Sequence, residues 1–255
     1  MIGIFDSGIG GLSSLLCLRE LLPRADLVYY ADEAHLPYGE KSAPEICTLA
    51  EAACARLVRE GATAILAACG TASSVALSYL QERFSVPIFG IVAPSARAVA
   101  ATEINGDILI LATEASIRAE VFTHEIARFA THGCLHTLPC PDFVHMTESG
   151  RTDPSDPKNR EETARILAPA LGHSIGTVVL GCTHFSFLSR LIAPFFPDAV
   201  LIDAAREGAK AMAEALPDCE KAGRSECRLL TSGDTECFLQ KAKRILGISQ
   251  HTGRH

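Results

Sequence analysis

Short apolar runs alternate along the chain with longer stretches in which apolar residues recur at helical spacing. Residues 2–5, which read Ile-Gly-Ile-Phe, predict a strand, and residues 12–22 predict a helix that ends at Pro23. Further strands are expected at residues 27–30, 64–68 and 88–92, and further helices at residues 44–60 and 72–83. Because strands and helices of these lengths alternate, we expect an α/β fold with a parallel sheet covered by helices on both faces.

The same alternation then starts again in the second half of the chain. Strands are expected at residues 107–112, 134–138, 177–180 and 199–202, helices at 116–132, 161–171, 187–196 and 204–216, and a last strand and helix between 228 and 246. Crossovers are expected near Pro94 and at Asp203-Ala204. The prediction is therefore two open α/β lobes with mainly parallel sheets, the first formed by residues 1–93 and 204–255 and the second by residues 94–203.

Two segments, one in each predicted lobe, share one layout. Residues 64–71 (AILAACGT) and residues 177–183 (TVVLGCT) each form an apolar strand that ends in a cysteine and leads into a helix. Cys69 and Cys182 are thus expected at the carboxyl ends of parallel strands, which is the edge where open α/β sheets bind ligands. If the lobes are pseudo-symmetric, related by an approximate twofold axis, the two thiols face each other across a cleft that holds the active site.

Two opposed thiols near helix N-termini have a specific chemical use. A helix N-terminus lowers the pKa of a thiol from about 8.5 into the range of about 3.5–7.5. One sulfur can then remove a proton from one face of a carbon atom while the other returns a proton to the opposite face. This chemistry needs no metal and no organic cofactor. The ordinary fate of a free cysteine is a small buried apolar residue, and we expect it for the cysteines outside this pair, which include Cys17, Cys47, Cys54, Cys219, Cys227 and Cys237.

Composition limits the classes of function. The 255 residues include 48% hydrophobic residues and carry a net charge of −7, which exclude global disorder and give no support to a surface that binds nucleic acid. No segment has the pattern of a secretory signal, none approaches the roughly 18 apolar residues of a membrane span, and the chain begins directly at its first strand. We therefore expect a cytoplasmic protein with reduced thiols, no membrane partner and no N-terminal extension for an activator. The sequence leaves open whether the chain forms a homodimer.

One dense group of cysteines and histidines is a candidate zinc site. It consists of His132, Cys134, His136 and Cys140. No Cys-x-x-Cys or His-x-x-x-His pair supports it elsewhere in the chain, so we expect ordinary thiols and no metal site.

Five segments together resemble glutamate racemase. They are residues 3–12 (GIFDSGIGGL), 37–39 (PYG), 68–72 (ACGTA), 181–185 (GCTHF) and 231–234 (TSGD). The resemblance runs from the first residues to the last strand, in the same order and spacing. It implies cofactor-independent interconversion of L- and D-glutamate, which supplies D-glutamate for peptidoglycan, in two pseudo-symmetric α/β lobes.

The resemblance also implies roles for particular residues. Cys69 and Cys182 match the two catalytic acid/bases, Asp6 matches a carboxylate near Cys69, and His184 and Glu148 match its counterparts beside Cys182. The residues that match substrate contacts are Asp6, Ser7, Tyr38, Gly39, Gly70, Thr71, Thr183 and His184. The alternative is structural: Asp6 and Ser7 would cap a helix, Tyr38 would be a turn residue, His184 would lie in the core and Glu148 in a solvated loop.

Substrate binding is expected to depend on neutral groups. The loops at residues 6–11, 37–39, 69–74 and 182–186 contain no lysine or arginine. An anionic substrate would then be held by backbone N–H groups at helix starts and by hydroxyl groups, with Asp6 facing the ammonium group.

The chain departs from the family pattern most clearly at Gly70, where asparagine is usual. Hydrogen bonds to charged groups contribute roughly 1.5–3 kcal/mol, so loss of the amide would weaken transition-state binding about ten- to a hundredfold. Glycine is also expected to enlarge the pocket beside Cys69, and restoring asparagine to lower the Michaelis constant for glutamate. Milder departures are Ala93 where glutamate is usual, Ser116 where threonine is usual and Ser186 where proline is usual.

Three other functions are compatible with parts of the sequence. A related two-cysteine racemase or lyase could act on aspartate or another small acid, and the pocket next to Gly70 would distinguish it. A catalytically silent ligand-binding paralogue would not exchange the Cα proton with solvent. A nucleotide-binding protein is suggested by Gly8-Ile9-Gly10 and Asp32, but Ser13 stands where a third glycine belongs.

Overall fold

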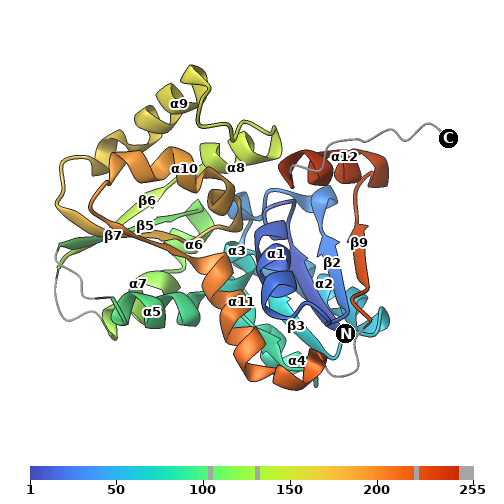
Figure 1. Cartoon of the computed structure of the whole chain (residues 1–255). Helices are drawn as coiled ribbons and strands as arrows, with labels where there is room; N and C mark the ends of the chain where they lie inside the picture. Colours follow the sequence, from blue (N-terminus) through green and yellow to red (C-terminus); the bar gives the residue numbers. More distant parts are fainter. Residues whose placement is uncertain (103–105, 130–132, 221–223, 247–255) are drawn as a thin grey trace.

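The computed structural model describes residues 1–102, 106–129, 133–220 and 224–246, and it contains two sheets (Figure 1). All the strand pairs in both sheets are parallel. The five-stranded sheet has the order β4 (Ile88–Phe89), β3 (Ala64–Ala67), β1 (Ile2–Asp6), β2 (Leu27–Ala31) and β9 (Cys227–Thr231). The four-stranded sheet has the order β6 (Leu135–Pro139), β5 (Asp107–Ala112), β7 (Ile175–Leu180) and β8 (Val200–Asp203).

The two sheets repeat one topology. When the strands of each lobe are numbered along the chain, both sheets have the order 4-3-1-2: β4-β3-β1-β2 in the first and β8-β7-β5-β6 in the second. The first sheet gains an extra edge strand, β9, because the end of the chain returns to pair with β2. This confirms the predicted α/β class with two parallel-sheet lobes, while the exact lobe boundaries stay a prediction.

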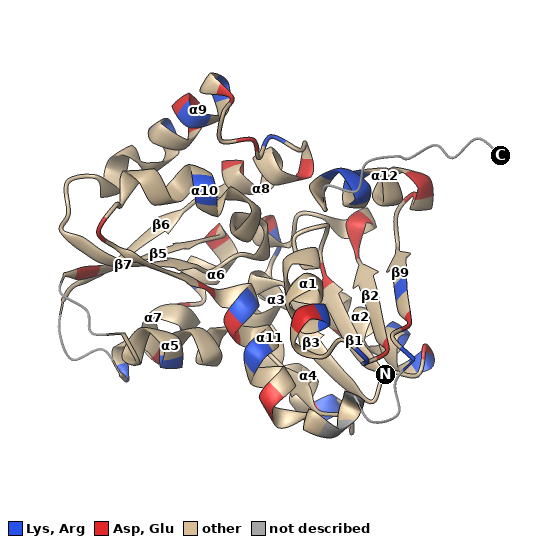
Figure 2. Ribbon diagram, viewed as in Figure 1, with Lys and Arg blue, Asp and Glu red and all other residues tan. Residues whose placement is uncertain are grey.

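Helices cover the sheets on both sides (Figure 1). They are α1 (Leu12–Leu21), α2 (Ala43–Arg59), α3 (Gly70–Val75), α4 (Leu77–Arg83), α5 (Val92–Ala100), α6 (Glu114–Arg118), α7 (Val121–Ala127), α8 (Pro141–Glu148), α9 (Pro157–Leu167), α10 (Ser189–Ile192), α11 (Ala204–Ala215) and α12 (Thr235–Ile245). None of these described helices is long and apolar enough to cross a lipid bilayer. In the view of Figure 2, basic and acidic residues are interspersed on outer helices such as α9 and α11.

Local sequence explains the longest helix. In α2, Ser42 and Glu45 form a capping box that satisfies free N–H groups at the helix start. The buried residues of this helix recur at the i, i+4, i+7, i+8 and i+11 positions, so they form one apolar stripe against the first sheet; they are Ile46, Ala50, Ala53, Cys54 and Leu57.

One apolar core spans both lobes. It contains Ile4 and Leu66 of the first sheet and Ile110 and Val179 of the second, all buried. Helix α11 packs against both α1 and α5 and thereby joins the lobes (Figure 1). Because burial of apolar surface is the main stabilising term in folding, this shared core fixes the relative placement of the two sheets.

Five predicted elements were wrong in extent, among them the helix expected at 161–171, which is α9 and runs from Pro157 to Leu167. The strand expected at 88–92 ends at Phe89, and helix α5 begins at Val92, with Pro94 in the first turn, where it removes no helical hydrogen bond. The helix expected at 72–83 is divided at Ala76 into α3 and α4, and the one expected at 116–132 is divided at Glu120, whose φ is 54°. Residues 130–132 of that prediction lie outside the described residues. The helix expected at 187–196 consists largely of 3-10 turns around α10, and helices α5 and α8 were not predicted at all.

Candidate active site

A cavity of about 310 Å³ lies between the lobes at the carboxyl ends of the strands. Its wall contains residues that directly follow the central strands: Ser7 after β1, Thr113 after β5 and, one residue further on, Cys69 and Cys182 after β3 and β7. Its described lining contains no lysine or arginine and consists of Ser7, Leu36, Pro37, Tyr38, Gly39, Glu40, Cys69, Thr71, Thr113, Glu114, Pro141, Asp142, Val144, His145, Cys182, Thr183 and His184.

The two cysteines occupy equivalent positions in the two lobes. Each is 4% exposed and stands directly before a helical segment, α3 after Cys69 and the 3-10 helix Thr183–Leu188 after Cys182. The Cys69 thiol donates to the Ser7 hydroxyl at 3.7 Å. Burial, followed by the nearby Asp6 carboxylate, raises the pKa of the Cys69 thiol to about 12. Both sulfur-bearing residues therefore line one cavity, as the repeated sequence pattern predicts.

Asp6 lies behind the wall of this cavity rather than in it. The side chain is fully buried; Oδ1 accepts the N–H of Gly8 at 2.9 Å and Oδ2 accepts the Thr183 hydroxyl at 2.9 Å. Burial raises the pKa of Asp6. The expected contact between Asp6 and a substrate ammonium group is not supported by this geometry, because Asp6 is absent from the described lining and reaches the second lobe through Thr183.

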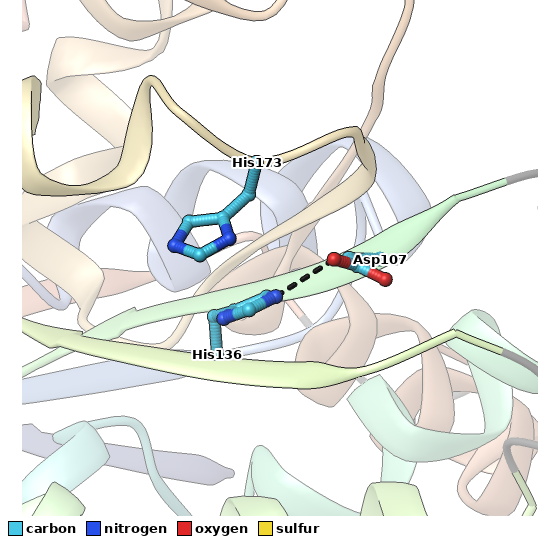
Figure 3. A group of neighbouring side chains, drawn as sticks. All are labelled: Asp107, His136 and His173. Atoms are coloured by element: carbon cyan, nitrogen blue, oxygen red, sulfur yellow. Dashed lines mark hydrogen bonds and ion pairs between the residues drawn. The ribbon is translucent and has the colours of Figure 1, made fainter.

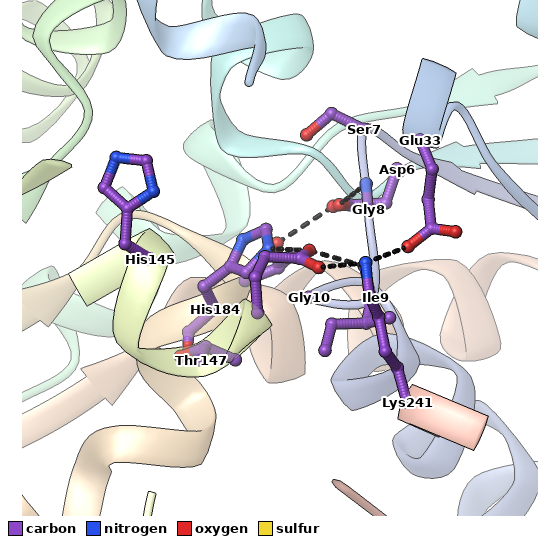
Figure 4. Close-up of polar contacts among 12 residues, drawn as sticks. Asp6, Ser7, Gly8, Ile9, Gly10, Glu33, His145, Thr147, His184 and Lys241 are labelled. Atoms are coloured by element: carbon purple, nitrogen blue, oxygen red, sulfur yellow. Dashed lines mark hydrogen bonds and ion pairs between the residues drawn. The ribbon is translucent and has the colours of Figure 1, made fainter. Parts of the chain in front are cut away.

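A chain of polar contacts runs from His184 to the loop after β1 and to Lys241 (Figure 4). His184 is 2% exposed; its Nδ1 lies 3.6 Å from the Cys182 sulfur and its Nε2 lies 2.9 Å from Glu148 Oε1. Glu148 also accepts the N–H of Ile9 at 3.0 Å, and its other oxygen lies 3.3 Å from Lys241 Nζ. Glu148 therefore ends helix α8 inside a network that joins both lobes, and the alternative of a solvated loop carboxylate is wrong.

This network requires a glycine in the first loop. A Cβ at Gly10 would lie 2.5 Å from His184 Nδ1 and 2.5 Å from the Thr183 hydroxyl oxygen. Only glycine allows the backbone to approach the imidazole this closely.

Burial and pairing act in opposite directions on the Glu148–His184 pair. Burial alone would raise the pKa of Glu148, but the hydrogen bond from His184, the charge of that ring, the N–H of Ile9 and the Lys241 ammonium together lower it to about 2. Burial likewise opposes a charged imidazole, yet the contacts with Cys182 and Glu148 raise the pKa of His184 well above its ordinary value. The pair is therefore an ion pair at neutral pH.

Changing Glu148 to glutamine is expected to remove a pH-dependent part of the stability. Because the pKa of Glu148 is lower in the folded chain, its stabilisation is complete above its ordinary pKa and is lost as the pH falls towards about 2. The difference in free energy of unfolding between the wild type and Glu148→Gln should shrink by about 2 kcal/mol between pH 6 and pH 3. Urea denaturation at each pH measures this difference in the free energy of unfolding. The control is Glu114→Gln, which changes an exposed carboxylate paired with Arg118. Identical pH dependence of the wild type and Glu148→Gln would contradict this account.

The remaining predicted contacts are placed as follows. Tyr38 lines the cavity, but its hydroxyl donates to Asp32 at 2.7 Å, and Asp32 also accepts the Ser232 hydroxyl at 2.7 Å. Gly39 allows the loop to approach Thr113, since a Cβ there would lie 2.9 Å from that side chain. Thr71 meets the Thr113 hydroxyl at 2.9 Å across the lobes.

The position of Gly70 differs from two expectations. It is not among the described residues that line the cavity, so the enlarged pocket beside Cys69 is wrong, and its assignment as a substrate contact has no support in this geometry. Its Cβ position points instead at the Gly181 carbonyl oxygen, well under 3.0 Å away and next to Cys182. The glycine thus allows the backbones of the two lobes to meet beside the second cysteine.

Several lining residues were missed from the sequence, namely Leu36, Glu40, Thr113, Glu114, Asp142, Val144 and His145. One signal could have found Thr113: it follows the first strand of the second sheet, as Ser7 follows the first strand of the first. Lys241 was also missed, because nothing in the pattern of α12 indicates that it reaches Glu148.

The candidate zinc site expected among His132, Cys134, His136 and Cys140 is not formed by its two cysteines, because they lie at opposite ends of β6. Cys134 precedes this strand and is exposed, whereas Cys140 follows it and is buried, with its thiol donating to the Leu138 carbonyl at 3.4 Å. His132 lies outside the described residues. These two cysteines therefore do not share a binding site.

Comparison with known proteins identifies the class of protein to which this chain belongs. Residues 17–212 match the family described as Asp/Glu/Hydantoin racemase. The glutamate racemase of Herpetosiphon aurantiacus is 38% identical over 244 residues, which cover 93% of this chain and 94% of that protein.

Solved structures agree with this match. The glutamate racemase of Thermus thermophilus in complex with β-chloro-D-alanine superposes with a TM-score of 0.83 at 35% identity and covers 96% of this chain and 92% of that one. The glutamate racemase of Francisella tularensis in complex with D-glutamate superposes with a TM-score of 0.86 at 27% identity and covers 98% of this chain and 94% of that one. The chain therefore belongs to the glutamate racemases, a group of isomerases, which confirms the resemblance that its motifs indicated.

Proposed function

We propose that this protein interconverts L- and D-glutamate by a two-base mechanism in which Cys69 and Cys182 act on opposite faces of the substrate Cα. One observation carries the proposal: two buried cysteines at equivalent strand ends of two like-ordered sheets line one cavity. The glutamate racemase relatives, one of them solved with D-glutamate, support glutamate as the substrate. The D-glutamate product would supply peptidoglycan synthesis, as the resemblance implies.

The proposed reaction balances within the site. A thiolate removes the Cα proton and forms an S–H bond, while the electron pair of the broken C–H bond delocalises into the substrate carboxylate. The opposite thiol then gives its proton to the other face of Cα and becomes the thiolate. One proton enters and one leaves, no oxidant or reductant is consumed, and the reverse reaction uses the two sulfurs in exchanged roles.

The surroundings of the two sulfurs favour different starting roles. Cys69, with a pKa raised to about 12, starts as the thiol that donates a proton. The Cys182 sulfur faces the buried His184 ring, whose positive charge stabilises negative charge on the sulfur. Glu148 orients that ring through Nε2, and Asp6 fixes Thr183 beside Cys182. We therefore assign first proton abstraction to Cys182, with His184, Glu148 and Asp6 as positioning groups.

Substrate binding in this proposal depends on hydroxyl groups and backbone N–H groups. Four residues that carry hydroxyl groups line the cavity, namely Ser7, Thr71, Thr113 and Thr183, and the described lining offers no lysine or arginine to a carboxylate. Backbone N–H groups at the starts of α3 and of the 3-10 helix after Cys182 are suited to hold carboxylates. This arrangement keeps lysine and arginine side chains out of the described lining around both thiols.

The test is to incubate the protein separately with L-glutamate and D-glutamate, without added cofactor, and to follow optical activity by circular dichroism. Either enantiomer should reach a racemic mixture, and in D2O the product should carry deuterium at Cα. Aspartate is the matched substrate control. Faster turnover of aspartate than of glutamate would replace the substrate assignment, and the absence of Cα exchange with every acid would indicate a silent binding protein.

A further inference from the structure

A second cluster of chemically active side chains lies at the opposite end of the second sheet from the cavity. Asp107 is the first residue of β5, His136 lies near the start of β6, and His173 lies in the turn that precedes β7. The cavity opens at the carboxyl ends of these strands, so this cluster at their amino ends belongs to a different part of the molecule and has no role in the proposed reaction.

The three side chains converge. Nε2 of His136 lies 2.8 Å from Asp107 Oδ2, and the rings of His136 and His173 lie with their centroids 3.9 Å apart and their planes tilted by 33°. One potential ligand atom from each of the three residues lies within 4.8 Å of the other two. Figure 3 shows the His173 ring over the His136 ring, with the Asp107 carboxylate beside them.

The backbone holds the carboxylate in place. Asp107 Oδ1 accepts the N–H of Cys134 at 2.8 Å, which lowers the pKa of Asp107 together with the contact to His136. The flanking Gly106 and Gly133 have φ values of +125° and +79°, and a side chain at either would collide with neighbouring backbone. These two glycines bring the starts of β5 and β6 together and fix one charged oxygen against one imidazole nitrogen.

We propose that Asp107, His136 and His173 bind a divalent transition-metal ion of the zinc, nickel or cobalt class. Two imidazole nitrogens and one carboxylate oxygen suit these ions, whereas calcium and magnesium prefer a shell of oxygen atoms. A zinc–nitrogen bond of about 2.0–2.1 Å places two ligand atoms at most about 4.2 Å apart, so a side chain whose ligand atom lies beyond this limit must move inwards. His173 can do so, because it is exposed and lies in a turn.

A bound ion would tie β5, β6 and the turn before β7 together at the edge of the second sheet. Anything that binds the folded chain and not the unfolded chain raises the melting temperature in proportion to the logarithm of its concentration. Because the cavity is at the other end of the sheet, we expect metal binding here to stabilise the protein and to leave the racemisation rate unchanged.

Cobalt(II) is the best probe, since thiolate ligands give it a charge-transfer absorption that nitrogen and oxygen ligands do not. The metal-stripped full chain should bind one equivalent of cobalt(II) without that absorption, displaceable by zinc, with a higher melting temperature. His173→Ala and His136→Ala should each weaken binding at least about tenfold. The control is His124→Ala, since His124 is an exposed histidine 3.8 Å from Glu120 that belongs to no group of three potential ligands among the described residues.

Two results would overturn the proposal. One is cobalt affinity and thermal shift in His173→Ala equal to those of the wild type, and the other is a thiolate absorption that accounts for all the bound metal. His173 is exposed, so its alanine variant tests the site even if His136→Ala fails to fold.

Discussion

Replacing either Cys69 or Cys182 by serine is expected to lower the rate of glutamate racemisation at least about a thousandfold in both directions. A positioned acid or base contributes about 10²–10⁴ to a rate, and a serine hydroxyl is a far weaker acid than a thiol, so it neither donates the proton nor forms the base at neutral pH. Both cysteines line the cavity, so either change removes one face of the reaction. Circular dichroism measures the rate of racemisation in reactions that start from each enantiomer.

The two variants should also differ from each other. The cysteine that remains can still remove a proton from its own face and return one to the same face. In D2O each variant should therefore exchange the Cα proton of one enantiomer without inverting it, and the two variants should select opposite enantiomers. Cys47→Ser is the control, because Cys47 lies on α2 outside the cavity lining. Near wild-type racemisation by either active-site variant would remove the two-base mechanism.

Replacing Gly70 by asparagine is expected to lower kcat/KM for glutamate roughly ten- to a hundredfold. The sequence comparison suggested the opposite effect, because asparagine is the usual residue. The new Cβ would overlap the Gly181 carbonyl oxygen and displace the backbone beside Cys182. Overpacking of this kind costs about 1–3 kcal/mol, which corresponds to the predicted loss if the displacement moves the sulfur away from Cα.

Steady-state kinetics with both enantiomers and urea denaturation check this prediction. Gly70→Ala carries the same Cβ and should lose a similar amount. Gly172→Asn is the matched control, since a Cβ at Gly172 meets no atom within 4 Å. A lower KM with an unchanged kcat for Gly70→Asn would mean that the lobes separate to admit the amide, and the contact between Gly70 and Gly181 would then have no role in shaping the site.

Two of the errors in the predicted elements share one cause. Whether a helix is divided at Glu120 or whether Val92 belongs to a strand depends on packing between helices that are distant in sequence, such as α5 with α7. Helix α8 escaped prediction because Pro141 and the mixed residues that follow form only a weak periodic pattern, although the helix places Glu148 against His184.

The sequence by itself determined the order of the strands, the parallel α/β class and the two cysteines that follow equivalent strands, because hydrophobic periodicity and turn residues act over short distances along the chain. Only the tertiary structure decided that Asp6 is shielded behind Thr183, that Lys241 of α12 reaches Glu148 and that Gly70 touches Gly181. These contacts join residues up to 177 positions apart, and they form only when the shared apolar core brings the two sheets together.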